Sequence, residues 1–391
     1  MARLRHATKS AGCSHSSNDL PFLPLHVLFG YLMHSIAYHL AKKQDNFQLL
    51  RIIAALMVIY GHSFALAQDI GTKDIFLRFA WPMYSGDIAV AMFFVISGFM
   101  VSGSYIGRAN LTEFMLARLL RIVPAMLVVL LVCTCVGVVF TTLDARAYFA
   151  SSDTWRYLVQ NLRFSSDMVW TLPGVFQGHR LQPVNGSLWT LPAEMRMYLL
   201  VAAMGVLGLL RGWRLGTLAV LLLIIAGILH PRLLPLHTDW LRLAAYFCVG
   251  ILAQLHKERI EIRHDVMFVL VFLTYISYNT DSFIWLFGAT VSYFCFWFAY
   301  RTPYIDLGKF GDPSYGIYLW GWPLQQAMIS WFPSMTPTPN FLLGAAAAVM
   351  MGSLSWHAIE RPALSLKGRI GRWLARLQAR RGVTAAGVDK A

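Results

Sequence analysis

Apolar stretches of about 20 residues recur along the chain and alternate with shorter polar connections. A helix of that length crosses the hydrocarbon core of a bilayer. The stretches also hold small and polar residues, which indicates that many of the helices face one another. The pattern predicts membrane-spanning helices at Phe47–Ala67, Phe79–Ser104, Arg121–Leu143, Glu194–Leu210, Leu215–His230, Trp240–Leu255, Val266–Tyr278, Phe283–Tyr300, Ser314–Phe332 and Phe341–Ile359.

The composition supports a membrane domain. Apolar residues make up 57% of the 391-residue chain and charged residues only 13%. A soluble domain carries roughly 25% charged residues, because its surface faces water. A single soluble core is therefore excluded, and we expect no separate soluble catalytic domain.

Lysine and arginine occupy every second connection, and such residues gather on the cytoplasmic side of membrane helices. The opposite connections, 68–75, 231–239, 279–281 and 334–340, are nearly free of them. Both ends of the bundle are then cytoplasmic and residues 144–193 are external. The net charge of +14 follows from this topology, so we expect no nucleic-acid partner. The basic residues that carry the signal are Lys42, Lys43, Arg108, Arg118, Arg121, Arg211, Arg214, Lys257, Arg259, Arg263, Arg301, Lys309, Lys367, Arg369, Arg372, Arg376, Arg380 and Arg381.

The sequence thus predicts an all-α fold. It is a polytopic membrane helix bundle of about ten transmembrane helices, with an external loop segment between helices three and four. We divide the chain into an N-terminal extension (1–45), a transmembrane domain (46–362) and a basic cytoplasmic tail (363–391). The extension could lie along the membrane interface, form an eleventh span, or result from an over-called start codon; we favour an interfacial or loosely ordered segment.

Cysteine spacing indicates neither a metal site nor a disulfide framework. Cys133, Cys135, Cys248 and Cys295 lie in predicted spans, and Cys13 lies in the extension. We therefore expect buried packing residues and no metal.

The first predicted helix carries Arg51 and His62, eleven residues apart. At about 100° per residue they share one face, separated by a rise of roughly 16 Å. Ionisable groups at such depth usually face a polar cavity or a partner. Arg51 could be an interfacial anchor and His62 a satisfied polar group. Alternatively, His62 is a candidate base, because neutral imidazole accepts a proton near pH 7.

The second predicted helix carries Asp87 and the pair Ser97-Gly98. Asp87 lies near the external end, where it could orient a histidine or a sugar, or remain an interfacial group. We assign Ser97 to helix packing, because small residues let membrane helices approach one another.

Arg118 and Arg121 lie three residues apart at the cytoplasmic surface. On a helix they form one basic face, and arginine forks match phosphate oxygens. They could bind the phosphates of coenzyme A, or act only as positive-inside anchors.

The external segment ends in the run Asn185–Glu194. Trp189 offers a flat face for a sugar ring or an interfacial anchor. Glu194 could bind substrate or assist proton transfer, and a carboxylate is also favourable at a helix N-terminus.

Together these residues resemble acyltransferase family 3, a family of integral-membrane acyltransferases. The resemblance covers about residues 46–365, in the family's order, and agrees with its ten-helix core. Several motifs carry it: Asn46–Arg51 with Gly61-His62, Phe93–Phe99, Arg118 with Arg121, Gly186–Glu194, Ser314–Trp320 and Ser355–Pro362.

The resemblance implies roles for the individual residues. His62 matches the family's essential histidine, and Arg51 the basic residue before it. Arg118 and Arg121 match a pair implicated in acyl-CoA use, and Glu194 an acidic position important for activity. In the ninth span many members carry a histidine where this chain has Gly321, which excludes a catalytic histidine there.

The implied activity is transfer of an acyl group, most simply acetyl, from acyl-CoA to a hydroxyl of a cell-surface glycan or its lipid-linked precursor. We expect Arg118, Arg121 and Arg51 to hold the donor, and Trp189 and Glu194 to face the acceptor; Asp87 joins Trp189 as a candidate substrate-binding residue. His62 would act as base or as transient acyl carrier. The expected location is a bacterial inner (cytoplasmic) membrane.

A secondary transporter or flippase for glycans or small molecules is the alternative from another class. It explains many spans and buried ionisable residues equally well. It does not explain a cytoplasmic arginine pair combined with a histidine on the first helix.

Overall fold

The computed structural model describes residues 35–67, 71–233 and 236–373. Within these ranges the regular structure is helical, apart from isolated β-bridges that pair Ser35 with Glu261 and Thr141 with Val175. The all-α prediction is confirmed for this part of the chain. Cys13, most of the N-terminal extension and the tail beyond residue 373 lie outside the described residues.

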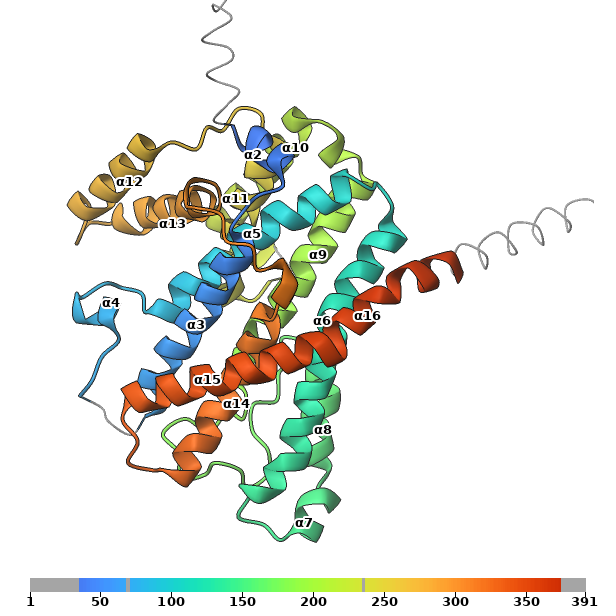
Figure 1. Ribbon diagram of the computed structural model, residues 1–391, viewed down its shortest axis with the longest axis vertical. Helices are drawn as coiled ribbons and strands as arrows, with labels where there is room; N and C mark the ends of the chain where they lie inside the picture. The colour runs from blue at the N-terminus through green and yellow to red at the C-terminus, as the bar shows by residue number, and fades with distance from the viewer. Residues whose placement is uncertain (1–34, 68–70, 234–235, 374–391) are drawn as a thin grey trace, which may run out of the picture.

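The α-helices follow one another in a single bundle (Figure 1). Their bounds are α2 Ile36–Lys42, α3 Phe47–Leu66, α4 Ile75–Arg78, α5 Ser85–Ile106, α6 Leu111–Val136, α7 Ala145–Ala150, α8 Ser152–Leu162, α9 Leu191–Val206, α10 Trp213–Leu229, α11 Thr238–Leu255, α12 His264–Ile276, α13 Phe283–Arg301, α14 Ser314–Trp331, α15 Pro337–Ser355 and α16 Arg361–Ser365.

Each predicted span corresponds to one helix: α3, α5, α6 and then α9 to α15 in turn. Among the described residues, 5 helical segments are long and apolar enough to cross a membrane: α3, α5, Leu111–Val139, α13 and Pro337–Trp373. The remaining predicted spans are helices that are shorter or less apolar. The chain therefore reads as an integral membrane protein, and the count of ten crossings stays a prediction.

The predicted start of the second span at Phe79 is wrong. Helix α4 ends at Arg78, Ala80 has a φ of 55°, and α5 begins only at Ser85. The Asp74 carboxylate accepts hydrogen bonds from the Ser85 amide at 3.3 Å and from its hydroxyl at 2.6 Å. These bonds hold the intervening apolar run as a turn.

The predicted start of the third span at Arg121 is also wrong, because α6 begins at Leu111. The Asn110 side chain accepts from the Glu113 amide at 3.0 Å and caps the helix. Arg118 therefore lies inside α6 with Arg121 rather than in a connection. Arg118 and Arg121 therefore belong to α6, whereas Arg108 remains in the connection before it.

Connections that are predicted to share a face contact one another. The Ile36 amide donates to the Ile260 carbonyl at 3.0 Å. This bond joins the N-terminal extension to the connection between α11 and α12, and both are predicted to be cytoplasmic. On the opposite face, the Tyr278 hydroxyl donates to the Phe79 carbonyl at 2.9 Å. Helices α7 and α8 of the predicted external segment lie at one end of the molecule, far from α2 (Figure 1). These contacts agree with the predicted alternation, although no membrane is present to fix the sides.

Helix α5 lies at the centre and packs closely against α11. A Cβ at Gly98 would lie 2.0 Å from the Phe247 carbonyl oxygen, and one at Gly250 would lie 2.2 Å from the Val95 carbonyl oxygen. Only glycine allows this backbone approach. The packing interpretation of this region therefore holds for Gly98.

Three of the cysteines predicted to be buried, Cys133, Cys248 and Cys295, are buried. Cys135 is exposed, against the prediction, because a two-residue step on α6 turns it away from the core.

Candidate functional site

A cavity of about 320 Å³ lies among α3, α5, α6, α9 and α14; we call it the polar cavity. Ligand pockets commonly measure roughly 300–1,000 Å³. Its lining includes Arg51 of α3, Arg118 and Arg121 of α6, and Glu194 of α9. Four site residues predicted from three separate motifs therefore face one space.

Asp312, just before α14, binds two of these arginines. Its Oδ2 accepts from Arg51 Nη2 at 2.9 Å and from Arg121 Nη2 at 2.8 Å, while Oδ1 accepts from the Ser314 hydroxyl at 2.6 Å. Burial opposes ionisation, but the two guanidinium groups and Ser314 outweigh it and hold the pKa of Asp312 below its usual value. Asp312 is therefore a carboxylate near neutral pH and ties α3 to α6.

Glu360 provides the second anion for Arg121. The Arg121 Nη1 donates to Glu360 Oε2 at 2.9 Å, and the Ser355 hydroxyl donates to Oε1 at 3.0 Å. Glu360 is fully buried in a π-helical turn, Trp356–Glu360, that joins α15 to α16. Such turns often occur at functional sites. Arg121 is thus held between two carboxylates.

Arg118 differs from Arg121 because no carboxylate pairs with it among the described residues. Its guanidinium lies 5.7 Å from the centre of the Tyr198 ring and 5.9 Å from that of Phe114. Its Nε is buried without a hydrogen-bond partner in the same part of the chain. Arg118 therefore has no ion-pair partner in the described part of the chain, and Glu194 lines the same cavity as the nearby anion.

Glu194 contacts Tyr198, one helical turn further along α9. The Tyr198 hydroxyl donates to Glu194 Oε1, and both side chains line the polar cavity. Around the cavity, Arg51, Arg121, Asp312 and Glu360 form ion pairs with one another. Arg118 and Glu194 are left as the cation and anion without an ion-pair partner in the described structure.

His62 does not line the polar cavity. It is buried, with 6% of its surface exposed, and its ring meets that of Trp322 edge to face at a centroid distance of 4.7 Å. Its Nδ1 has no hydrogen-bond partner among the described residues. The single helix α3 carries both His62 and Arg51, as the sequence predicts.

Helix α14 connects His62 to the cavity. Tyr318 lines the cavity, and Trp322, the contact of His62, follows one turn later, a rise of about 6 Å. The Tyr318 hydroxyl is hydrogen-bonded to Thr190 at 2.8 Å and donates to the Ser187 carbonyl at 2.7 Å. His62 therefore lies about one helical turn beyond the end of the cavity.

Asp87 and Trp189 lie outside the polar cavity. Asp87 accepts a hydrogen bond from Arg242 of α11 at 2.8 Å. Trp189 lies in the turn Gly186–Thr190, and its carbonyl accepts from the Trp240 indole at 3.1 Å. Both residues lie beside the start of α11, so the sequence-predicted residues divide into two groups.

Gly321 packs directly against α3. A Cβ at this position would lie 2.6 Å from Ile59 Cγ1. The space that a histidine side chain would need is filled by α3, which explains structurally why this chain carries glycine in that motif.

Sequence reasoning did not select Asp312, Glu360 or Tyr198. Glu360 lies within the quoted run Ser355–Pro362, and Asp312 lies two residues before the run Ser314–Trp320, so the motifs mark their neighbourhood. Ser97, assigned to packing, instead lines the polar cavity. No group of His, Cys, Asp and Glu suited to a metal ion occurs among the described residues.

Comparison with known proteins places the chain in a wider context. The family described as "Acyltransferase domain", acyltransferase family 3, matches residues 44–357. An "O-acetyl transferase" of Shigella phage Sf6 is 28% identical over 338 residues, covering 82% of this chain and 96% of the relative. "Nodulation protein 10" of Rhizobium leguminosarum bv. viciae is 25% identical over 365 residues, covering 84% and 95%. No solved structure matches.

Proposed function

Because the chain belongs to acyltransferase family 3, we propose that it moves an acetyl group from acetyl-CoA to a hydroxyl of a cell-surface glycan or its lipid-linked precursor. The family makes it an acyltransferase, and its long apolar helices make it an integral membrane protein. We choose acetyl as the acyl group because the phage relative is named an O-acetyl transferase. The glycan acceptor is our inference. We assign the protein to a bacterial inner membrane.

One observation carries the proposal. Arg51, Arg118, Arg121 and Glu194, which come from three different motifs, line one cavity inside the helix bundle. A donor that carries phosphates and a reactive thioester needs cations at one end and a water-poor space at the other. The polar cavity offers the arginines, and apolar side chains such as Phe93, Phe94 and Ile122 form part of its wall.

We assign the donor to this cavity. Arg118 is the cation free to bind a phosphate oxygen, while Arg51 and Arg121 keep donors that their carboxylate bonds do not use. At about 320 Å³ the cavity suits the acyl group and adjoining arm of the coenzyme better than the whole molecule. The nucleotide end would then extend from the cytoplasmic mouth.

His62 has two possible chemical roles. As a base it takes the proton of the acceptor hydroxyl, the hydroxyl oxygen attacks the thioester carbonyl carbon, the carbon–sulfur bond breaks, and the imidazolium returns a proton to the leaving thiolate. As a carrier its ring nitrogen attacks the carbonyl carbon, the carbon–sulfur bond breaks and the coenzyme A thiolate leaves; the acceptor oxygen then attacks the acetyl carbon, the carbon–nitrogen bond breaks, and the acceptor proton passes to the thiolate. Both roles need the acetyl carbon to reach His62, whose contact Trp322 lies one turn along α14 from the cavity-lining Tyr318.

Trp189 belongs to the acceptor side in this proposal, and Glu194, which lines the polar cavity with the arginines, would meet the acceptor hydroxyl there. The turn that holds Trp189 packs on Trp322, because a Cβ at Gly186 would lie 2.7 Å from the Trp322 ring. An acceptor sugar placed against this turn would therefore be close to the ring that contacts His62. Asp87 could assist by orienting Arg242.

Labelled acetyl-CoA tests the function. Purified protein in detergent, with no ion gradient, should transfer acetyl label to a glycan acceptor and release coenzyme A in equal amount. A transporter or flippase would consume no thioester under these conditions. Absence of thioester turnover with every glycan acceptor, alongside gradient-driven uptake in vesicles, would favour the transporter.

A further inference from the structure

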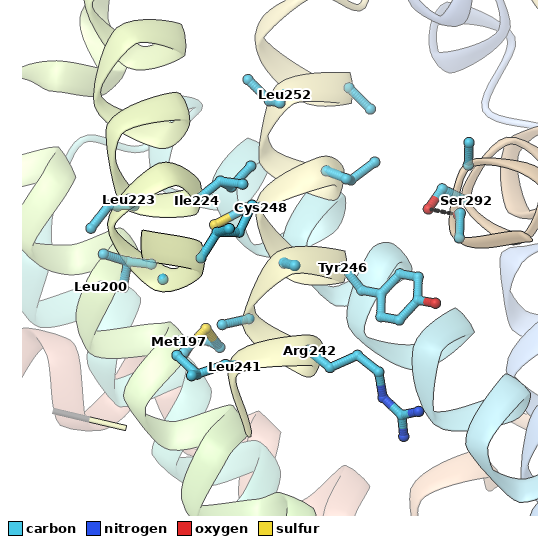
Figure 2. A pocket seen from close by; sticks show the side chains of 18 of the residues that line it. Met197, Leu200, Leu223, Ile224, Leu241, Arg242, Tyr246, Cys248, Leu252 and Ser292 are labelled. Carbon is cyan, nitrogen blue, oxygen red and sulfur yellow. Dashed lines mark hydrogen bonds between the residues drawn. The ribbon is translucent and has the colours of Figure 1, made fainter. Parts of the chain in front are cut away.

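A second and larger cavity, of about 1180 Å³, opens on the side of the bundle; we call it the lateral groove. It is lined by α9, α10, α11, α12 and α13 (Figure 2). In Figure 2, α11 lies in the centre, with Leu223 and Ile224 of α10 on one side and Ser292 of α13 on the other. The groove exceeds the roughly 300–1,000 Å³ of ordinary ligand pockets.

The walls suit a hydrocarbon chain. Most lining residues are aliphatic, aromatic or small. The Ser292 hydroxyl donates to the Gly288 carbonyl at 2.7 Å, and the Tyr293 hydroxyl donates to the Glu261 carbonyl at 3.0 Å, so neither offers a free polar group. Within a membrane, such a surface is matched by lipid chains.

Two arginines lie at one end of the groove. Arg196 and Arg242 are near the first turns of α9 and α11, about 6–8 Å along each helix from its start. Arg196 donates to the Phe164 carbonyl at 3.1 Å, so this end is next to the segment predicted to be external. Cations at the boundary of an apolar groove complement the phosphate of a lipid headgroup.

Both arginines retain binding capacity. Arg242 is 40% exposed and makes one hydrogen bond in the described structure, to Asp87, although a guanidinium has five donor hydrogens. Arg196 bonds only neutral carbonyls and lies 4.7 Å from the centre of the Trp240 ring. Arg196 therefore keeps its full positive charge.

The groove also adjoins the proposed reaction site. Trp240, at the start of α11, donates to the Trp189 carbonyl, and Thr190 beside it lines the polar cavity. On α9, Met197 faces the groove and the next residue, Tyr198, faces the polar cavity. A headgroup at the arginines would lie beside the turn that we assign to the acceptor.

We propose that the lateral groove binds the hydrocarbon chain of a lipid phosphate that carries the acceptor glycan, with its phosphate at Arg242 and Arg196. This proposal rests on the acyltransfer function proposed above and selects the lipid-linked acceptor. The lateral groove adjoins the turn Gly186–Thr190, which we assign to the acceptor and call the acceptor turn. This position favours a substrate lipid, because an ordinary bilayer phospholipid would not need to lie beside the acceptor.

A photoreactive long-chain isoprenoid phosphate provides the probe. In detergent-solubilised full-length protein it should label peptides of α11 or α13. Unlabelled isoprenoid phosphate should compete, and a tenfold excess of phosphatidylglycerol should not. Equal competition by phosphatidylglycerol would mean a site for ordinary bilayer lipid and would overturn the proposal.

Two variants sharpen the test. A Cβ at Gly288 would make an ordinary 3.4 Å contact with the Tyr246 hydroxyl, so the ring of Gly288→Phe would extend into the groove. Labelling should fall about tenfold in Gly288→Phe and in Arg242→Gln, which removes one charged donor. Leu218→Phe, on exposed α10 surface outside the groove, is the matched control and should label as wild type. Unchanged labelling of Gly288→Phe and Arg242→Gln would contradict the proposal.

Turnover separates this inference from the proposed function. Gly288→Phe should raise the KM for a lipid-linked acceptor about tenfold relative to a soluble fragment of the same glycan. If wild-type protein acetylates neither acceptor, the proposed function fails, and the labelling result still decides whether the groove binds a lipid phosphate. If both acceptors show the same change in KM, the groove does not select the lipid.

Discussion

Arg118 and Arg121 lie three residues apart on α6 but have different partners. Arg121 is bound by Asp312 and Glu360, whereas Arg118 has no ion pair among the described residues and lies beside the rings of Tyr198 and Phe114. The sequence predicts that both face the same site, because they share a helix face. It could not predict their different pairing, because both carboxylates come from distant parts of the chain and meet Arg121 only in the folded bundle.

Replacing each arginine should separate binding from structure. Arg118→Gln should raise the KM for acetyl-CoA about tenfold or more, since one charge-assisted bond is lost, and should leave thermal stability almost unchanged. Arg121→Gln should also lower the free energy of unfolding, by roughly 3–5 kcal/mol, because it leaves buried Glu360 without an ion-pair partner and Asp312 with Arg51 alone. Steady-state kinetics and thermal unfolding measure both effects. A KM within twofold of wild type in Arg118→Gln would mean that Arg118 does not bind the donor and serves only as a positive-inside anchor.

His62 is the residue on which the chemistry depends. His62→Ala should insert normally, because the ring makes one aromatic contact and its Nδ1 has no partner within the described chain. Acetyl transfer should fall at least about 10²-fold, the lower range for loss of a general base. His62→Gln should not restore it, because an amide does not accept a proton near neutral pH. Near-normal turnover by His62→Gln would show that another group moves the proton.

At the scale of helices, every span that the hydrophobic pattern predicts corresponds to a helix in the structure. The pattern fails at helix ends, where single residues decide. Asn110 caps α6 well before the predicted start of the span. Asp74 bonds Ser85 and so separates the preceding apolar residues from α5. Hydrophobicity does not predict which helices pack closely against each other. The small residue Gly98 did indicate a close contact on α5, and its partner is α11.

Gly98 tests the packing of α5 on α11. Gly98→Ala should lower the unfolding temperature, because its Cβ would lie 2.0 Å from a backbone oxygen that cannot swing aside. Gly212→Ala is the control: its Cβ would meet nothing within 4 Å, so stability should stay close to wild type. Equal unfolding temperatures for both variants would contradict the close crossing.

Reporters can test the predicted sides of the helices. A reporter fused after Arg381 should read cytoplasmic, and one inserted near Ser152, between α7 and α8, should read external. These results follow from the distribution of basic residues. An external reading after Arg381 would contradict the predicted topology. Arg118 and Arg121 would then lie on the external side, away from the cytoplasmic donor.

For the whole molecule, the structure separates two groups of predicted residues. One group lines the polar cavity, and the other lies near the start of α11, beside the lateral groove. His62 lies about one helical turn beyond the cavity, next to the acceptor turn. The motifs identified most of these residues, but their division between the cavity and the groove depends on tertiary contacts that sequence spacing does not contain.

With the predicted topology, our proposal is that acetyl enters from the cytoplasmic face and leaves on an acceptor at the external face. Inside-out membrane vesicles test the claim most directly, because their cytoplasmic face is outward. Labelled acetyl-CoA, which does not cross the bilayer, is supplied outside and the acceptor is sealed inside. The account predicts labelled acceptor in the lumen with wild-type protein and almost none with His62→Ala. Labelling only when donor and acceptor share one side, or equal labelling with His62→Ala, would contradict it.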